Sequence, residues 1–517
     1  MRRRAAELLG YAVLVAGALA VRLVGLDDRP FHHDESQDAY FSWLFLTTGE
    51  YEYQPILHGP LRFYLTAATY GILGDTDLTA RLAPALMGTL MVPLPYLLRA
   101  QLGRIGAFAA AVGLAFGPAY LYYGRFARED IYIACITLAL LVVTFRFLDR
   151  PRRHQPALIG ALLALSFATK ESTFITVFVA GTFFMAAVAL QVRRHGVRAA
   201  PLVRAVTAVG WEAWASALAA FVLVFTLLFT VFLTDPGGLW AGIHDGLAYW
   251  LGQHGPGRGE KEWFFYLVVL FAEEWPALLL GAVGVAVALR RPTLLRAFLI
   301  WDFVLSLAVY SWANERFSWL VLHPLLPLLL LAGLGVQGIW NARSRWPGRA
   351  GLAVVLVCAL HTGYASWWAN VENGADPREL LVTTQSAEQV TAVRDEVLMV
   401  AARAEREGRD VSVLVDSANG ATFPWAWYFR DLPAGYLDLS AAPFPADTDV
   451  AVLTDESRER LLGDLAGYEG RRFPFRVWWV RDYDEMSMGN WWRWFSRREP
   501  WNPTGGLPEW LYVRQGA

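Results

Sequence analysis

The sequence is poor in charge and in cysteine. Charged residues fill 18% of its 517 positions, whereas average proteins carry about 25%, so a purely soluble fold is disfavoured. Its two cysteines, Cys135 and Cys358, lie in apolar runs and form neither a disulfide framework nor a zinc motif. A net charge of -2 gives no sign of nucleic-acid binding. The remainder, 55% hydrophobic and 14% aromatic with a mean hydropathy of +0.32, is typical of a helical membrane protein with many spans.

Long apolar runs divide residues 1–368. The first run follows three arginines, as in a signal peptide, but further runs follow at once, and we therefore interpret it as an uncleaved helix. A membrane helix needs about 20 mainly apolar residues, and the pattern predicts about eleven such helices. They are expected at 6–26, 80–100, 105–123, 131–148, 157–171, 173–191, 212–233, 263–289, 297–312, 319–340 and 350–368.

Arginines in the short loops predict an orientation. They precede the first run and recur in every second loop, with Arg99, Arg150, Arg193, Arg290 and Arg343 among them. Because cytoplasmic loops carry the excess of basic residues, the N-terminus is predicted to be cytoplasmic. The chain is then a multi-pass protein of the cell membrane, and its loops 27–79, 124–130 and 234–262 face the other side.

The last segment, 369–517, is predicted to be a separate extracytoplasmic α/β domain. A helical pattern covers 386–406, and short buried strands are expected at 411–415, 450–453 and 476–480. Strands that alternate with helices are typical of α/β folds. The aromatic residues of this segment fit core packing or docking onto the membrane domain, with glycan binding as an alternative.

An acidic stretch stands where the first helix leaves the membrane. It contains His33, Asp34 and Glu35. Ionisable groups at such a boundary are costly and indicate function, although a helix-capping pair is the structural alternative. The loop then continues to residue 79, and its segments 38–48 and 61–73 are expected to lie on the membrane surface as two short helices.

Four further charged positions lie in turns on the same predicted side. Arg128, Glu129 and Asp130 crowd one short loop, where the carboxylates could hold a metal or an acceptor and the arginine could bind a phosphate. An interfacial ion cluster is the structural alternative. Lys170 stands in a tight turn, either as a salt-bridge partner of its neighbour or as a phosphate ligand.

Two more sites are candidates by position. Arg316 lies at the start of a helix on the predicted outer side. It could bind a lipid phosphate, or it could extend its side chain to the membrane interface. Glu273 and Glu274 fall inside an apolar run just before Pro276, where they could bind an acceptor or pair with an arginine. One kinked helix is the prediction for that run, and an interfacial helix followed by a shorter span is the alternative.

These features together resemble the GT-C superfamily of membrane glycosyltransferases. The resemblance is to the branch of protein O-mannosyltransferases and aminoarabinose transferases, and within it to a subfamily sometimes labelled as associated with flippase activity. It rests on the pair Asp34-Glu35, on His58-Gly59-Pro60-Leu61 where many relatives have Lys-Pro-Pro-Leu, on the stretch 123–130, and on Asn314-Glu315-Arg316-Phe317 followed by His323-Pro324.

The resemblance implies an enzyme that transfers a sugar from a polyprenyl phosphate to an extracytoplasmic acceptor with inversion. The acceptor would be a glycolipid, a cell-envelope glycan or a protein, as in protein glycosylation. Asp34 would be the catalytic base, and Glu35 would orient it. Glu129 and Asp130 would form the second acidic motif. Ligands of the donor phosphate would be Arg128, Arg316, Lys170 and His58, the last with less charge than the relatives' lysine.

Two alternatives stay open. A divalent metal ion is a candidate cofactor, with Asp34, Glu35, His33 and Asp130 as candidate ligands, although their spacing matches no defined motif. The rival function is a flippase or transporter of lipid-linked glycans, or its non-catalytic accessory subunit. Transporters often show matching halves, and this chain has no visible half-to-half similarity.

Overall fold

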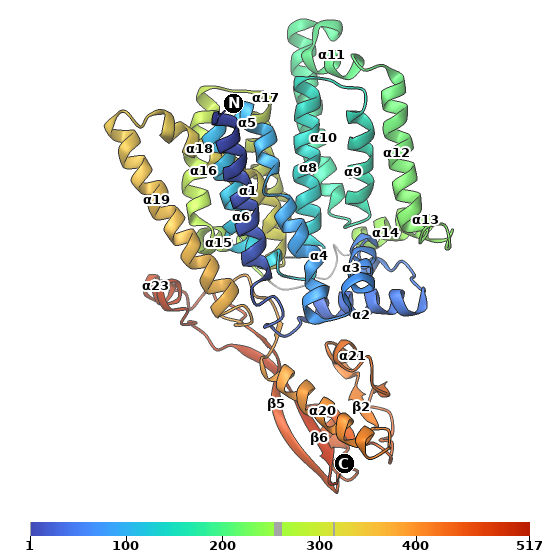
Figure 1. The fold of residues 1–517 in the computed structure, drawn as a ribbon. Helices are drawn as coiled ribbons and strands as arrows, with labels where there is room; N and C mark the ends of the chain where they lie inside the picture. Colours follow the sequence, from blue (N-terminus) through green and yellow to red (C-terminus); the bar gives the residue numbers. More distant parts are fainter. Residues whose placement is uncertain (1, 253–260, 314–315, 517) are drawn as a thin grey trace.

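A bundle of long helices and a mixed β-sheet make up the protein. The sheet lies at the end of the bundle opposite the N-terminus (Figure 1). The computed structural model describes residues 2–252, 261–313 and 316–516. This architecture confirms the prediction of a helical membrane protein with a C-terminal sheet domain.

Eight segments of the described residues are long and apolar enough to cross a membrane, and all eight coincide with predicted spans. They are Arg4–Leu23 in α1 (Arg2–Leu23), Asp77–Leu102 from α4 (Asp77–Leu90) to α5 (Arg99–Leu102), α8 (Asp130–Asp149), α10 (Thr173–His195), α12 (Trp211–Phe229), α17 (Leu294–Trp312), Ser318–Asn341 ending in α18 (Leu322–Asn341), and Trp346–Glu372 beginning with α19 (Trp346–Trp367).

Two other predicted spans are shorter than expected. The run 105–123 breaks at Gly117 into α6 (Arg104–Phe116) and α7 (Pro118–Tyr123), and the run 157–171 contains only α9 (Gln155–Phe167). Both α6 and α9 have 13 residues, which makes each about 20 Å long. The hydrocarbon core is about 30 Å thick, so the count of eleven spans is not confirmed.

The run 263–289 does not form the single kinked helix that the sequence predicts. It forms α15 (Phe265–Glu273) and α16 (Trp275–Arg290), which meet at an angle of 99°. Pro276 lies in the first turn of α16, where its missing N–H is not needed. The break therefore follows from a proline that can start a helix but cannot continue α15.

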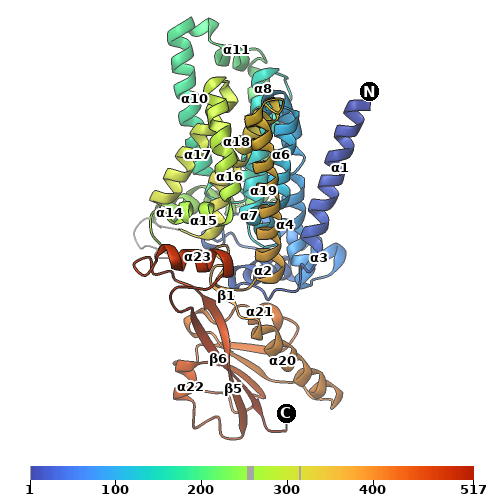
Figure 2. The ribbon, with the colours of Figure 1, turned by 90° about the vertical axis from the view of Figure 1, so that its left-hand side faces the viewer.

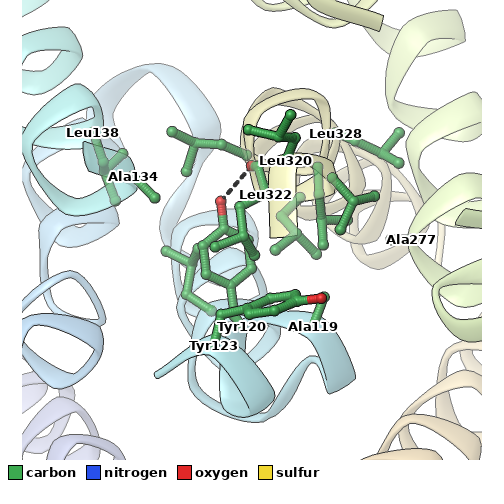
Figure 3. Packing of buried hydrophobic residues seen from close by; sticks show 14 of the residues in the cluster. Ala119, Tyr120, Tyr123, Ala134, Leu138, Ala277, Leu320, Leu322 and Leu328 are labelled. Atoms are coloured by element: carbon green, nitrogen blue, oxygen red, sulfur yellow. Dashed lines mark hydrogen bonds between the residues drawn. The ribbon is translucent and has the colours of Figure 1, made fainter. Parts of the chain in front are cut away.

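Helix α18 is the centre of the bundle, because the whole of its apolar window is buried inside the protein. Glycines let its neighbours approach closely. A Cβ at Gly333 would lie 2.3 Å from the carbonyl of Gly106 on α6, and one at Gly284 on α16 would lie 1.8 Å from the carbonyl of Leu331. Small residues have this role in membrane helix packing. At the end of α18 nearer the sheet, Tyr120 of α7 donates its hydroxyl to the Leu322 carbonyl (Figure 3).

Two helices of the first outer loop confirm the expected pair. They are α2 (His33–Thr48), which lies across the end of the bundle, and α3 (Leu61–Leu73) (Figure 1). A capping box fixes the start of α2: the His32 side chain accepts from the Asp34 N–H at 3.0 Å, and Glu35 accepts from the His32 N–H at 3.1 Å. The acidic pair is thus locked into the first turn of α2.

The C-terminal sheet has six strands in the order β1-β5-β6-β4-β2-β3. Its strands are β1 (Gln385–Ser386), β2 (Val413–Asp416), β3 (Ala434–Leu437), β4 (Val450–Thr454), β5 (Tyr468–Trp478) and β6 (Gly505–Arg514). β2 is parallel to β3 and β4, whereas β6 is antiparallel to β4 and β5. Helix α20 (Gln389–Arg406) covers it with a buried valine stripe. The expected strands 411–415 and 450–453 match β2 and β4, but 476–480 meets only the end of β5.

A buried ion cluster joins the C-terminal part to the bundle. Arg498 follows helix α23 (Met488–Arg497), which lies across the bundle end next to the sheet (Figure 2). Its guanidinium contacts Glu273 at 3.1 Å and Glu379 at 2.9 Å, and both carboxylates are almost fully buried. Glu379 also accepts from the indole of Trp368 at 2.8 Å. One arginine thus pairs with two acids from different parts of the chain.

Replacing Arg498 by methionine leaves two buried carboxylates without their cation. We expect Arg498→Met to lower the free energy of unfolding by about 3–5 kcal/mol, as is usual when one partner of a buried pair is removed. Unfolding in an SDS titration measures the change. The matched control is Arg497→Met, since Arg497 is 72% exposed; equal midpoints for the two variants would contradict the prediction.

Candidate active site

A cavity of about 330 Å³ lies where the bundle meets the sheet. Its bundle side is formed by the start of α2, the turn at η1 (Pro55–Leu57) and the loop before α8, and residues of the C-terminal part close the other side. The charged or titratable side chains that line it are His32, His33, Asp34, Asp38, His58, Arg62, Arg128, Glu129, Tyr249 and Arg476. Distant parts of the chain therefore build one polar chamber.

Asp34 faces this cavity from the first turn of α2. Its carboxylate forms an ion pair with the guanidinium of Arg128 and is 28% exposed, more than any other carboxylate of the cluster. The positive end of the helix dipole also favours a negative charge at this position. Asp34 is thus a charged, accessible acid held in a fixed direction.

The second acidic motif lies directly behind Asp34. Arg128 also contacts Glu129 at 3.3 Å and Asp130 at 3.1 Å. Lys170 reaches both carboxylates at 2.8 Å. The structure therefore brings together Asp34, Arg128, Glu129, Asp130 and Lys170, which the sequence analysis treated as three separate candidates.

Glu129 is the most heavily paired carboxylate of the cluster. Besides Arg128 and Lys170, it forms an ion pair with Arg62 and lies 3.4 Å from His58 Nε2. Burial alone would raise the pKa of Glu129, but Arg128, Lys170, His58 and Arg62 hold that pKa well below its usual range. Glu129 is therefore a charged centre around which the surrounding cations are arranged.

His58 links Glu129 to a further acid. Its Nδ1 lies 2.8 Å from Glu171, so Lys170 and Glu171 each pair with a partner other than the neighbouring residue. Burial lowers the pKa of His58, but Glu129 and Glu171 outweigh it and raise the pKa above the usual value. The backbone of His58 has φ 59° and ψ -161°, a region nearly confined to glycine and commonest at functional sites.

Sequence reasoning did not select three charged residues of this cavity. Asp38 and Arg62 form an ion pair at 2.8 Å, and Arg476 of β5 lies 2.8 Å from His33. A signal existed for Asp38, because it lies four residues after Asp34 and so on the same helix face. Arg62 and Arg476 reach the cavity only through the tertiary fold, and no local pattern marks them.

Glu35 points away from the cavity and is completely buried. Its carboxylate accepts from Arg81 Nε and Nη2 at 2.9 Å, from Arg29 at 3.1 Å, and from the N–H groups of Ala127 at 2.9 Å and His32 at 3.1 Å. Burial would raise its pKa, but Arg29 and Arg81 lower it to about 2. Because Ala127 precedes Arg128, this carboxylate ties Asp34 and Arg128 to one scaffold.

Glu35, Asp130 and Lys170 lie behind the cavity wall, and three further sequence candidates lie outside both the cavity and its ion cluster. Arg316 donates to the carbonyls of Ser311, at 3.1 Å, and of Lys261. Glu273 pairs with Arg498, and Glu274 accepts from the Ala119 N–H at 3.0 Å. Asn314 and Glu315, part of the same motif as Arg316, lie outside the described residues.

The candidate metal ligands do not form a metal site. Asp34 faces Arg128, Glu35 faces two arginines, Asp130 faces Lys170 and Arg128, and His33 lies between Gln37 and Arg476. Within residues 2–252, 261–313 and 316–516, no group of three or more His, Cys, Asp or Glu is placed to hold a metal ion. A divalent cation would compete with basic side chains already paired with these acids, so the residues do not fit it.

The fold is similar to that of known membrane glycosyltransferases. ArnT from Cupriavidus metallidurans, solved bound to undecaprenyl phosphate, superimposes with a TM-score of 0.62 at 14% identity over 96% of this chain and 97% of that one. The oligosaccharyltransferase AglB from Archaeoglobus fulgidus, in complex with an inhibitory peptide and a dolichol-phosphate, gives 0.57 at 12% identity over 90% and 73%. The chain therefore has the GT-C fold.

Part of the sequence also matches a family. Residues 57–211 fit the sequence model described as dolichyl-phosphate-mannose-protein mannosyltransferase. A search of curated proteins finds no match. The two comparisons agree on what this chain resembles, namely membrane glycosyltransferases of the GT-C fold.

Neutralising Glu35 should remove the charge that balances Arg81, whose side chain is fully buried. A pKa of about 2, against about 4.3 in an unfolded chain, corresponds to about 3 kcal/mol. Because the folded-state pKa is lowered, this stability is present above the unfolded pKa and is lost as the pH falls. At pH 7 we expect Glu35→Gln to unfold at a lower temperature than the wild type. The difference between the two melting temperatures should become smaller towards about pH 2. Thermal unfolding in detergent measures this difference. A difference that does not change with pH would contradict the ion pairing assigned to Glu35.

His58 should give the stability the opposite pH dependence. Its pKa is raised by Glu129 and Glu171, so its contribution is complete below about pH 6.5 and is lost as the pH rises through the folded-state value. We expect His58→Lys, which keeps the charge, to lose less stability than the wild type between about pH 6 and pH 9. Melting temperatures in detergent at both pH values test this, and parallel losses would refute it.

Proposed function

We propose that the protein transfers a sugar from a polyprenyl-phosphate donor to a hydroxyl-bearing acceptor outside the cytoplasm. The observation that carries the proposal is the position of Asp34, an ion-paired and accessible carboxylate in a cavity at the end of a GT-C bundle. ArnT and AglB structures of the same fold contain undecaprenyl phosphate and dolichol-phosphate, which supports a lipid-phosphate donor here.

In the proposed reaction Asp34 is the general base. The acceptor hydroxyl gives its proton to the Asp34 carboxylate while its oxygen bonds to the anomeric carbon of the donor sugar. The bond from that carbon to the phosphate oxygen breaks, and the polyprenyl phosphate leaves with the electron pair. Attack from the face opposite the phosphate inverts the configuration at the sugar carbon.

The basic residues around Asp34 have two parts in this proposal. Arg128 holds Asp34 and lies near the charge that develops on the leaving phosphate, where fixed cations stabilise a transition state. Lys170 and His58 keep Glu129 and Asp130 in place, and Arg316 acts at the edge of the site through the backbone of residue 261. Glu35 is then a positioning residue for Asp34.

The proposed topology follows the arginine pattern of the loops. The N-terminus is cytoplasmic, and the cavity and the sheet domain lie on the other side of the cell membrane. Arg476, Thr383 and Thr384 close the cavity from the C-terminal part, so this part would help to admit the acceptor, whether glycolipid, envelope glycan or protein. No comparison favours the flippase or transporter alternative.

Asp34→Asn tests the function. General-base catalysis is worth about 10²–10⁴-fold, so we expect transfer of a labelled sugar from polyprenyl phosphate to crude membrane acceptors to fall by that factor. Asp27→Asn is the matched control, because Asp27 is exposed in the same loop. Equal transfer by Asp34→Asn and the wild type would remove Asp34 as the base, and lipid translocation without transfer would favour the transporter.

A further inference from the structure

A second cavity, of about 580 Å³, lies beside the proposed active site. It opens between the start of α15 and the segment that follows β5. The residues that carry the argument are Lys261, Phe317, Trp478, Trp479, Arg481 and Tyr483, and one exposed acid, Glu262, also lines the cavity. None of the sequence candidates for catalysis faces this space.

Lys261 and Arg481 bring positive charge into this cavity without a carboxylate partner. Neither forms an ion pair with any acid in the described parts of the chain. The Arg481 Nε is buried and makes no hydrogen bond. Lys261 lies over the rings of Phe265, at 4.4 Å, and Phe317, at 5.5 Å. It is one of two lysines in the chain; the other, Lys170, has two acidic partners.

The first cavity offers the contrast. Two of its cations, Arg62 and Arg128, are each paired with two or more carboxylates, and the third, Arg476, lies against His33. A phosphate entering there would share Arg62 and Arg128 with the carboxylates that they already bind.

Lys261 and Arg481 are both half-buried. Glu273 and Glu379, which pair with Arg498, also attract Arg481. Taking a cation out of water without a direct ion pair is costly, and a bound anion would lower this cost in the second cavity.

Aromatic rings form much of the remaining wall. Trp479 is fixed by a hydrogen bond from its indole N–H to Asn502 at 2.9 Å and by the ring of Trp501 at 4.6 Å. Tyr483 packs edge-on against Phe264 at 5.1 Å. Amphipathic rings of this kind combine an apolar face with polar tips, which suits a polar headgroup on an apolar chain or on a sugar.

The two cavities share a wall. Phe317, Thr383 and Thr384 line both. The ring of Phe317 stacks on Trp319 at 4.5 Å with an interplanar angle of 8°, and Arg128 lies 3.9 Å above Trp319. A column of stacked groups thus connects the cation that holds Asp34 with Lys261, whose carbonyl is held by Arg316.

We propose that the second cavity binds a phosphate group carried on a sugar or a polyprenyl chain, with Lys261 and Arg481 as its charge partners. The proposal rests on the glycosyl transfer proposed above. Such a group is present on the donor lipid and can also be present on an anionic glycan acceptor. Bound there, it places the attached sugar next to Phe317 and within the adjoining space that contains Asp34.

The pKa of Lys261 is consistent with a phosphate site in the second cavity. Burial, together with Arg481, lowers the pKa of Lys261 to about 7. The lysine is therefore charged below that pH and loses its charge above it, and a bound phosphate would hold the proton in place. Arginine keeps its charge throughout this range, so Lys261→Arg separates the titration of the lysine from that of the phosphate.

Equilibrium dialysis of the purified full chain, without acceptor or turnover, tests the proposal with two labelled probes. Undecaprenyl phosphate in micelles represents the lipid source, and glucose 6-phosphate the glycan source. We expect Lys261→Gln and Arg481→Gln each to raise the Kd of at least one probe about tenfold, since a charge-assisted hydrogen bond is lost. Arg481→Lys should retain most of the binding, and Lys261→Arg should remove the weakening above about pH 7.

Arg472→Gln is the matched control, because Arg472 lies on β5 and is 56% exposed. An effect on undecaprenyl phosphate alone assigns the cavity to the donor, and an effect on glucose 6-phosphate alone assigns it to the acceptor. No binding by the wild type, or no difference from Arg472→Gln, overturns the proposal. If Asp34→Asn binds the probes normally but transfers no sugar, both the phosphate site and the role of Asp34 as base are supported. If Asp34→Asn transfers sugar normally, only the role of Asp34 as base is refuted.

Discussion

The neutralisation of buried carboxylates by buried cations is the constraint on which this structure depends. Glu129 alone has Arg62, Arg128, Lys170 and His58 as partners. They come from three stretches of the chain: residues 58–62, the loop of Glu129 itself, and the turn at Lys170. Taking a charge out of water costs several kcal/mol. If one of these stretches moved away alone, it would leave a buried charge without its partner. The cavity is therefore shaped by charge balance more than by apolar packing.

Charge balance also explains the division of labour within the acidic pair. Glu35 accepts five hydrogen bonds and is fully enclosed, whereas Asp34, one residue earlier, retains access to the cavity. Adjacent residues in the first turn of a helix point in directions about 100° apart. One therefore turns towards Arg81 inside the protein and the other towards Arg128 at the cavity. Their neighbourhoods, and not their similar chemistry, separate their roles.

Sequence reasoning recovered the parts of the structure that depend on local pattern. Hydropathy located the long spans, and the segments 38–48 and 61–73 form helices as expected. The arginine pattern of the loops placed Asp34, Arg128 and Lys170 on the same predicted side, but it left them as separate candidates and also included Arg316, which does not line the cavity. It could not supply Arg62, Arg476, Lys261 or Arg481, because their positions result from tertiary contacts. Arg62 reaches the cavity through the packing of α3 against α2 and the loop before α8, and Arg476 and Arg481 through the way the sheet domain packs on the bundle. Nor could it give the 99° bend after Glu273, since Pro276 fits either a kinked or a broken helix.

The enclosure of α18 has a consequence for biogenesis. The apolar part of α18 faces protein and not lipid. Its glycine-lined surfaces fit α6 and α16 and not acyl chains, so α18 is poorly suited to stand alone in the bilayer. Its main neighbours, α6, α16 and α17, are all synthesised before α18. They must therefore leave room for it, and the centre of the bundle can close only after the chain has passed residue 341.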